Sequence, residues 1–67
     1  MYFVEVEQEE DGRWIAEVSE LPGVIVYGQS RDEAVRGAQV LALRVLAERL
    51  EHGEAVPKVE AVFSIVA

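Results

Sequence analysis

Few side chains in this sequence have the chemistry and spacing that catalysis requires. His52 is the single histidine and the chain has no cysteine, so it offers neither a thiolate nucleophile nor a metal site built on these two residue types. Ser19, Ser30 and Ser64 have no histidine and aspartate companions at positions that suggest a nucleophilic triad. We therefore expect a protein that is not an enzyme and that holds no cofactor or metal ion.

The carboxylates are more informative, because several lie in segments that alternate like strands. Residues 2–8 and 13–19 alternate in side-chain type, and this period of two predicts strands with one face toward a core. The outward face is expected to gather acidic, apolar and aromatic side chains, namely Glu5, Glu7, Ile15, Glu17, Tyr27 and Glu60. Such a surface suits a basic protein partner. The alternative interpretation is an ordinary solvated face.

The turn between the first two strands fixes how they pair. A two-residue loop at Asp11-Gly12 would place apolar side chains opposite polar ones. A three-residue loop over 10–12, with Gly12 in the left-handed conformation, instead pairs Val6 with Ala16. Because a slip of one residue turns every side chain to the other face, we expect the second register. It places Glu5 directly opposite Glu17, an unfavourable pair of like charges.

Local signals then predict a turn, a third strand and a helix in quick succession. Pro22-Gly23 suits the central positions of a type II turn. The β-branched and aromatic run over residues 24–27 indicates a short strand. Ser30 followed by Glu33 forms a capping box, so a helix is expected from Arg31 to about Glu51, with Gly53 as its terminator.

The predicted helix has two apolar stripes. One is expected to cover the sheet and comprises Ala34, Val35, Ala38, Leu41, Ala42, Val45 and Leu46. The other lies on the opposite side and comprises Val40, Leu43, Ala47 and Leu50. Scattered apolar residues are normal on a surface, but four at contact spacing indicate an oligomer interface.

A last strand is expected from Lys58 to Val66, with its inner face formed by Val59, Ala61, Phe63 and Ile65. The element order is then β-β-β-α-β in one domain, residues 1–67, of the α+β class. The first three strands form an antiparallel meander, and the connection through the helix should be right-handed.

The size and the net charge of the chain limit the kinds of partner that it can bind. A domain of 67 residues buries little surface, so oligomerisation into a dimer or tetramer is an expected source of stability. Thirteen acidic against six basic residues give a net charge of −7, which would repel a phosphate backbone and attract a basic protein. No apolar run is long enough for a membrane span and no leader is visible, so we expect a soluble, cytoplasmic protein.

The segment from Trp14 to Ala34 contains an ordered pattern, which consists of Trp14, Ala16, Glu20-Leu21-Pro22-Gly23, Gly28, Ser30 and Glu33-Ala34. This pattern resembles the N-terminal domain of HicB-type antitoxins. Val24 departs from it, because family members often carry cysteine after the glycine. The chain also ends at Ala67, where complete HicB antitoxins continue into a DNA-binding domain.

The resemblance implies a partial ribonuclease-H-like fold, in which the fourth strand lies beside the first and parallel to it. The resulting mixed sheet carries one helix on one face. It also implies a partner of the HicA type, a small basic toxin that cleaves messenger RNA, which the domain would bind and occlude. Self-repression of an operon is not implied, since the DNA-binding segment is missing. The alternative is an orphan homo-oligomeric binding module without a toxin partner.

A ribonuclease-H-like fold also raises the question of a nuclease. Glu5, Glu7, Glu33 and Glu60 lie on the elements that carry metal-binding carboxylates in such enzymes. The predicted strands offer no aspartate, Glu33 is needed by the capping box, and no basic groove is visible for phosphates. These residues therefore favour a binding protein over a nuclease.

Overall fold

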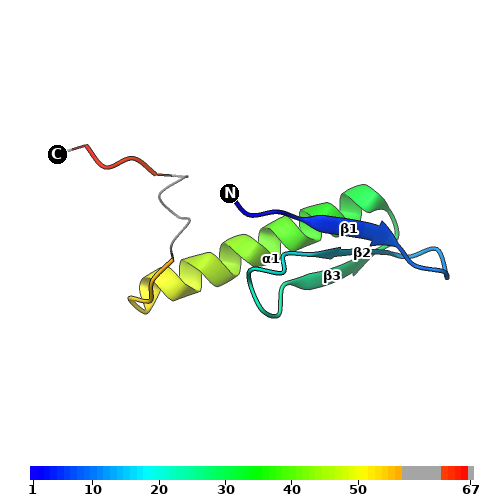
Figure 1. Cartoon of the computed structure of the whole chain (residues 1–67), viewed down its shortest axis with the longest axis horizontal. Helices are drawn as coiled ribbons and strands as arrows, with labels where there is room; N and C mark the ends of the chain where they lie inside the picture. Colours follow the sequence, from blue (N-terminus) through cyan, green and yellow to red (C-terminus); the bar gives the residue numbers. More distant parts are fainter. Residues whose placement is uncertain (57–62, 67) are drawn as a thin grey trace.

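Three antiparallel strands and one helix form two layers in the computed structural model, which describes residues 1–56 and 63–66 (Figure 1). The strands are β1 (Glu5–Gln8), β2 (Trp14–Glu17) and β3 (Ile25–Gly28), in the spatial order β1-β2-β3. The helix α1 (Arg31–Glu51) crosses one face of the sheet. The α+β class and the antiparallel meander are therefore confirmed, although the strands are shorter than the alternating segments.

The β1–β2 hairpin has the predicted register. Val6 lies opposite Ala16, and Glu5 lies opposite Glu17. The N–H of Glu9 donates to the carbonyl of Arg13 at 2.7 Å, which leaves a loop of residues 10–12. Gly12 ends this loop with φ of 94°, a conformation that glycine adopts without a side-chain clash.

The turn before β3 is built as expected. The N–H of Val24 donates to the carbonyl of Leu21 at 3.1 Å, and Gly23 has the positive φ, 89°, that a type II turn requires. Leu21 and Val24 point into the molecule and are almost fully buried. The turn therefore contributes two anchors to the core as well as reversing the chain.

Both ends of α1 are capped by the residues that the sequence indicated. The hydroxyl of Ser30 accepts a hydrogen bond from the N–H of Glu33 at 3.1 Å. The Glu33 carboxylate reaches back to the N–H of Gln29 at 3.3 Å, one residue before the cap. At the other end, Gly53 has φ of 73° and its N–H donates to the carbonyl of Leu50, which closes the last turn.

A row of alanines joins the two layers. Ala34, Ala38 and Ala42 recur every four residues along α1, and all three are buried against the sheet. Around this row pack half-buried apolar side chains from both layers, namely Tyr2, Val4, Val6, Trp14, Val26, Leu41, Val45 and Leu46. Small side chains at the contact allow the helix to approach closely, so the core is thin.

The predicted fourth strand is not confirmed. Val56 is buried, whereas residues 57–62 and 67 lie outside the described part of the chain. Residues 63–66 are described and are not in a strand. Phe63 and Ile65, which were expected on an inner face, are 65% and 95% exposed.

Candidate functional site: the open face of the sheet

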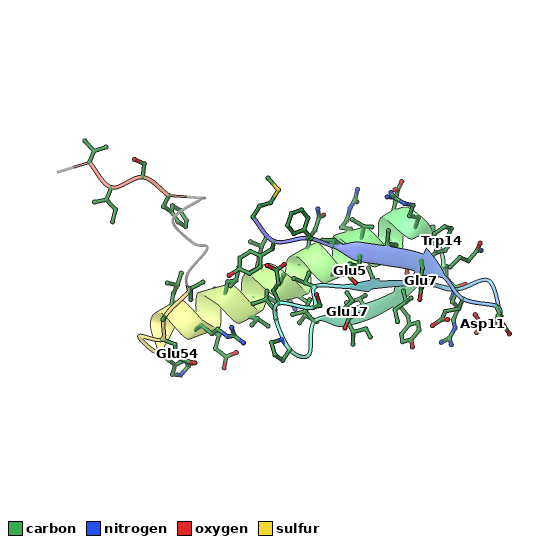
Figure 2. All side chains as sticks on the ribbon, in the orientation of Figure 1. Glu5, Glu7, Asp11, Trp14, Glu17 and Glu54 are labelled. Atoms are coloured by element: carbon green, nitrogen blue, oxygen red, sulfur yellow. The ribbon has the colours of Figure 1, made fainter. Side chains whose placement is uncertain are left out.

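The sheet has one face covered by α1 and one that no other described element covers (Figure 1). The register places two rows of side chains across the open face. Glu5, Glu17 and Ile25 form one row, and Glu7, Ile15 and Tyr27 form the next. Figure 2 shows the three carboxylates on β1 and β2. The acidic side chains therefore lie on one half of the face and the apolar ones beside them.

The apolar half of this face is accessible to a partner. Ile25 and Tyr27 on β3 are 47% and 49% exposed. Phe3, which is 63% exposed, lies at the other edge of the sheet, just before β1. Ile15, on the central strand, is half-buried. Exposed aromatic and aliphatic side chains at adjacent positions are the type of anchor that dominates binding energy in protein interfaces.

The acidic half forms a shallow depression. It is lined by Glu5, Val6, Glu7, Ile15 and Glu17. The Ser19 hydroxyl lies 3.4 Å from the Glu5 carboxylate and donates to it. None of the three carboxylates is neutralised by a basic side chain within the described residues. The depression therefore presents uncompensated negative charge next to apolar surface.

Arg13 lies at the border of the open face, and its contact with Tyr27 was not predicted from the sequence. Its guanidinium lies 4.7 Å from the centre of the Tyr27 ring, within the range of a cation–π contact. Its Nε also donates to the Asp11 carboxylate at 2.8 Å. The alternation of β2 places Arg13 on the outward face, but the contact with Tyr27 depends on how β3 pairs with β2.

The hairpin loop holds Asp11, whose carboxyl pKa is altered by its neighbours. The pKa of Asp11 is lowered, chiefly because its carboxylate accepts a hydrogen bond from the Arg13 N–H at 3.0 Å. The Arg13 side chain lowers the pKa further through its own hydrogen bond and its positive charge. The Arg13 side chain thus contacts both the Asp11 carboxylate and the Tyr27 ring.

The structure brings together five of the six residues predicted for this surface. Glu5, Glu7, Ile15, Glu17 and Tyr27 share the open face, whereas Glu60 lies outside the described residues.

The nuclease constellation is not assembled in the described part of the chain. Glu33 belongs to the helix layer and holds the Gln29 N–H, while Glu5 and Glu7 lie on the sheet. Among the described residues, no three histidine, cysteine or carboxylate side chains form a group that could hold a metal ion. His52 caps the helix end, where its Nδ1 lies 2.8 Å from the Glu48 carbonyl oxygen.

The second predicted surface lies on the other layer. Val40, Leu43 and Leu50 are 44%, 65% and 46% exposed on α1, and Ala47 is exposed between them. None of these four residues belongs to the core that joins helix and sheet. They form a continuous stripe on the back of the helix.

Comparison of the chain with protein-family models, with curated proteins and with solved structures gave no match. No described helix has the length and apolar character needed to cross a membrane.

Proposed function

We propose that this chain is a HicB-like antitoxin domain that binds a small basic toxin of the HicA type and occludes it. The observation that carries the proposal is the open sheet face, where three carboxylates lie beside the half-buried Ile15 and the exposed Ile25 and Tyr27. The resemblance over Trp14 to Ala34 supplies the class of partner. The turn and the helix cap within that segment have the geometry that its residues predict.

Inhibition would work by covering a surface of the toxin. Tyr27 and Ile25 supply the apolar anchors, which contribute most of the affinity once they are desolvated. Glu5, Glu7 and Glu17 attract the basic partner and disfavour acidic ones, so they raise the association rate and the specificity. This role requires no cofactor and no catalytic residue.

The charge of the chain supports a protein target rather than RNA itself. A net charge of −7 repels phosphates, so the chain would act on the toxin and not compete for its substrate by binding RNA. We also propose that residues 58–66 add a fourth strand beside β1, parallel to it, which would complete a partial ribonuclease-H-like sheet.

The proposal is tested with a small basic protein that cleaves messenger RNA and is encoded beside this chain, which the proposal requires to exist. Glu5→Lys combined with Glu17→Lys is expected to weaken binding at least tenfold and to flatten its dependence on salt, because attraction becomes repulsion. Isothermal titration at several salt concentrations measures both effects. Inhibition of RNA cleavage by the unaltered chain is the functional readout.

A matched control variant shows whether the loss of affinity comes from the open face or from the change in the net charge of the chain. Glu48→Lys combined with Glu54→Lys changes the net charge equally but alters exposed residues at the helix end of the molecule. It should leave the affinity within about threefold of the original. An equal loss in both double variants, or the absence of a basic neighbour that cleaves RNA, would refute the proposal. If no such toxin exists, the exposed apolar stripe on α1 would favour the alternative function, an orphan homo-oligomeric binding module.

A further inference from the structure

Strand β3 is an edge of the sheet, and its backbone can accept a further strand. The N–H of Val18 donates to the carbonyl of Val24 at 3.0 Å. Because hydrogen-bonding directions alternate along an antiparallel strand, Ile25 and Tyr27 turn their N–H and C=O groups away from β2. No described element lies along this outer side of β3 (Figure 1).

Most of these outward backbone groups lack a partner. The N–H of Ile25 reaches the Gly23 carbonyl at 3.2 Å. The N–H of Tyr27 and the carbonyls of Ile25 and Tyr27 make no hydrogen bond within the described residues. A row of unpaired donors and acceptors of this kind is the surface to which another strand adds.

The two edges of the sheet differ in the side chains that control such pairing. β1 carries Glu5 and Glu7, and charged side chains on an edge strand discourage pairing with a separate chain. The residues of β3, Ile25–Gly28, include no charge and no proline. Three of them are β-branched or aromatic, the types that favour strand pairing. Of the two edges, β3 is therefore the one suited to contact between chains.

The sequence of β3 complements itself in one antiparallel register. When Ile25 lies opposite Tyr27 of a second copy, the outward groups of both strands fall within the pair, and Val26 meets its own counterpart at the two-fold axis. Two pairs of an aromatic and a β-branched side chain then lie on the open face, a combination that stabilises antiparallel strands. A shift of two residues would pair Ile25 with Gln29 in one direction, or Tyr27 with Gly23 in the other. Both alternatives use a residue outside the strand.

Pairing at β3 also keeps the acidic side chains of two copies apart. Glu17, on the central strand, is separated from this edge by the whole of β3. Three strand spacings, about 14 Å, would lie between Glu17 and its counterpart, which exceeds the screening length of about 8 Å at physiological ionic strength. The open faces of two acidic chains can therefore lie side by side with little repulsion.

We propose that two copies of this chain associate edge to edge through antiparallel pairing of β3, with Ile25 opposite Tyr27 of the second copy. The two-fold axis is perpendicular to the sheet, so both helices lie on one side of the continuous sheet and both open faces on the other. Above Val26 each helix presents Gly37, which has no side chain to project over the axis. This pairing does not depend on the identity of the partner at the open face, and it leaves β1 free for the proposed fourth strand.

Cross-linking tests the register, because the chain has no cysteine of its own. Ile25→Cys and Tyr27→Cys are prepared separately and mixed under mild oxidation. Directly opposed residues of a hydrogen-bonded pair have Cα atoms about 5.5 Å apart, within the range of a disulfide. The mixture should therefore give disulfide dimers. Either variant alone places its two cysteines diagonally, about 7–8 Å apart, and should give few.

A proline variant tests whether the backbone of β3 makes the contact. Tyr27→Pro removes an outward N–H but no hydrogen bond to β2, so the circular dichroism spectrum should be retained. Sedimentation equilibrium should show dimerisation weakened by about tenfold or more, since two hydrogen bonds are lost by symmetry. Gln8→Pro is the matched control, because the Glu9 N–H points to β2 and the Gln8 N–H therefore points away from it. It should change dimerisation by less than about threefold.

Leu43→Cys, on the exposed back of α1, distinguishes strand pairing from contact between helices. Disulfide dimers of this variant, with none in the mixture of Ile25→Cys and Tyr27→Cys, would show that two copies meet at the helix and would overturn the proposal. A monomeric unaltered chain, or an equal loss of dimer in the two proline variants, would overturn it as well. If Tyr27→Pro does not fold, the cross-linking yields decide.

Discussion

Gly28 sits where the end of β3 meets the first turn of α1, and a side chain there has no room. A Cβ atom at this position would lie 2.7 Å from the backbone nitrogen of Ala34 and 3.1 Å from its Cα. Backbone atoms cannot move aside as a flexible side chain can. Gly37 lies similarly close on the helix side, where an added Cβ atom would lie 2.7 Å from a methyl group of Val26. These two glycines set the distance between the layers.

Replacing Gly28 by alanine should therefore destabilise the domain. We expect Gly28→Ala to lower the free energy of unfolding by about 1–3 kcal/mol, the usual cost of overpacking, because the start of α1 must shift. Urea denaturation measures the change. Gln29→Ala, at the exposed neighbouring position, serves as the control and should change stability by less than about 0.5 kcal/mol. Equal stability of the two variants would show that the helix can move without cost.

At the scale of elements, β1 and β2 hold a like-charge pair that works against the sheet. Glu5 and Glu17 are direct neighbours across the strands, and both are exposed on the open face. A pair of this kind is destabilising, so its presence is explained more readily by a basic partner than by the needs of folding.

Glu17→Gln should accordingly stabilise the isolated chain and weaken the complex. Removing one of the two charges is expected to raise the free energy of unfolding by about 0.2–1 kcal/mol, more at low salt than at high salt. Thermal unfolding at two salt concentrations measures this. Glu10→Gln in the exposed hairpin loop removes the same charge away from the pair and is the control. A destabilised Glu17→Gln variant would contradict the interpretation.

The elements show which features the sequence predicts well. The bounds of α1 agree with the prediction because Ser30, Glu33 and Gly53 act within a few residues of the helix ends. The hairpin register follows from Gly12 and the alternation on both sides. The contact of Arg13 with Tyr27 and the close approaches of Gly28 and Gly37 were not predicted, because they depend on neighbours distant in sequence.

At the scale of the molecule, the open face and the helix stripe belong to opposite layers, so each can be occupied without blocking the other. In the described structure β1 is an edge strand, and Phe63, Ile65 and Val66 are exposed apolar residues of the C-terminal segment. Unpaired edges and exposed apolar segments are both unfavourable, and pairing would remove both.

Deleting residues 58–67 should expose the edge of β1 if these residues form the fourth strand. The amides of β1 are then expected to exchange with solvent faster, while those of α1 near Ala38 keep their protection. Hydrogen exchange followed by NMR measures both groups of amides in the same sample. Ile65→Glu is a milder variant and should shift the β1 amides in the same direction. Unchanged exchange in both variants would argue against the fourth strand.

The alanine row also affects the conformational entropy of folding. Ala34, Ala38 and Ala42 have no side-chain rotamers to lose when they are buried, whereas each leucine fixed in a core loses about 0.5–1 kcal/mol of rotamer freedom. The contact between helix and sheet therefore forms with little side-chain entropy loss. A chain of 67 residues has limited apolar area to bury. The alanines therefore reduce the side-chain entropy that folding costs at the contact between its two layers.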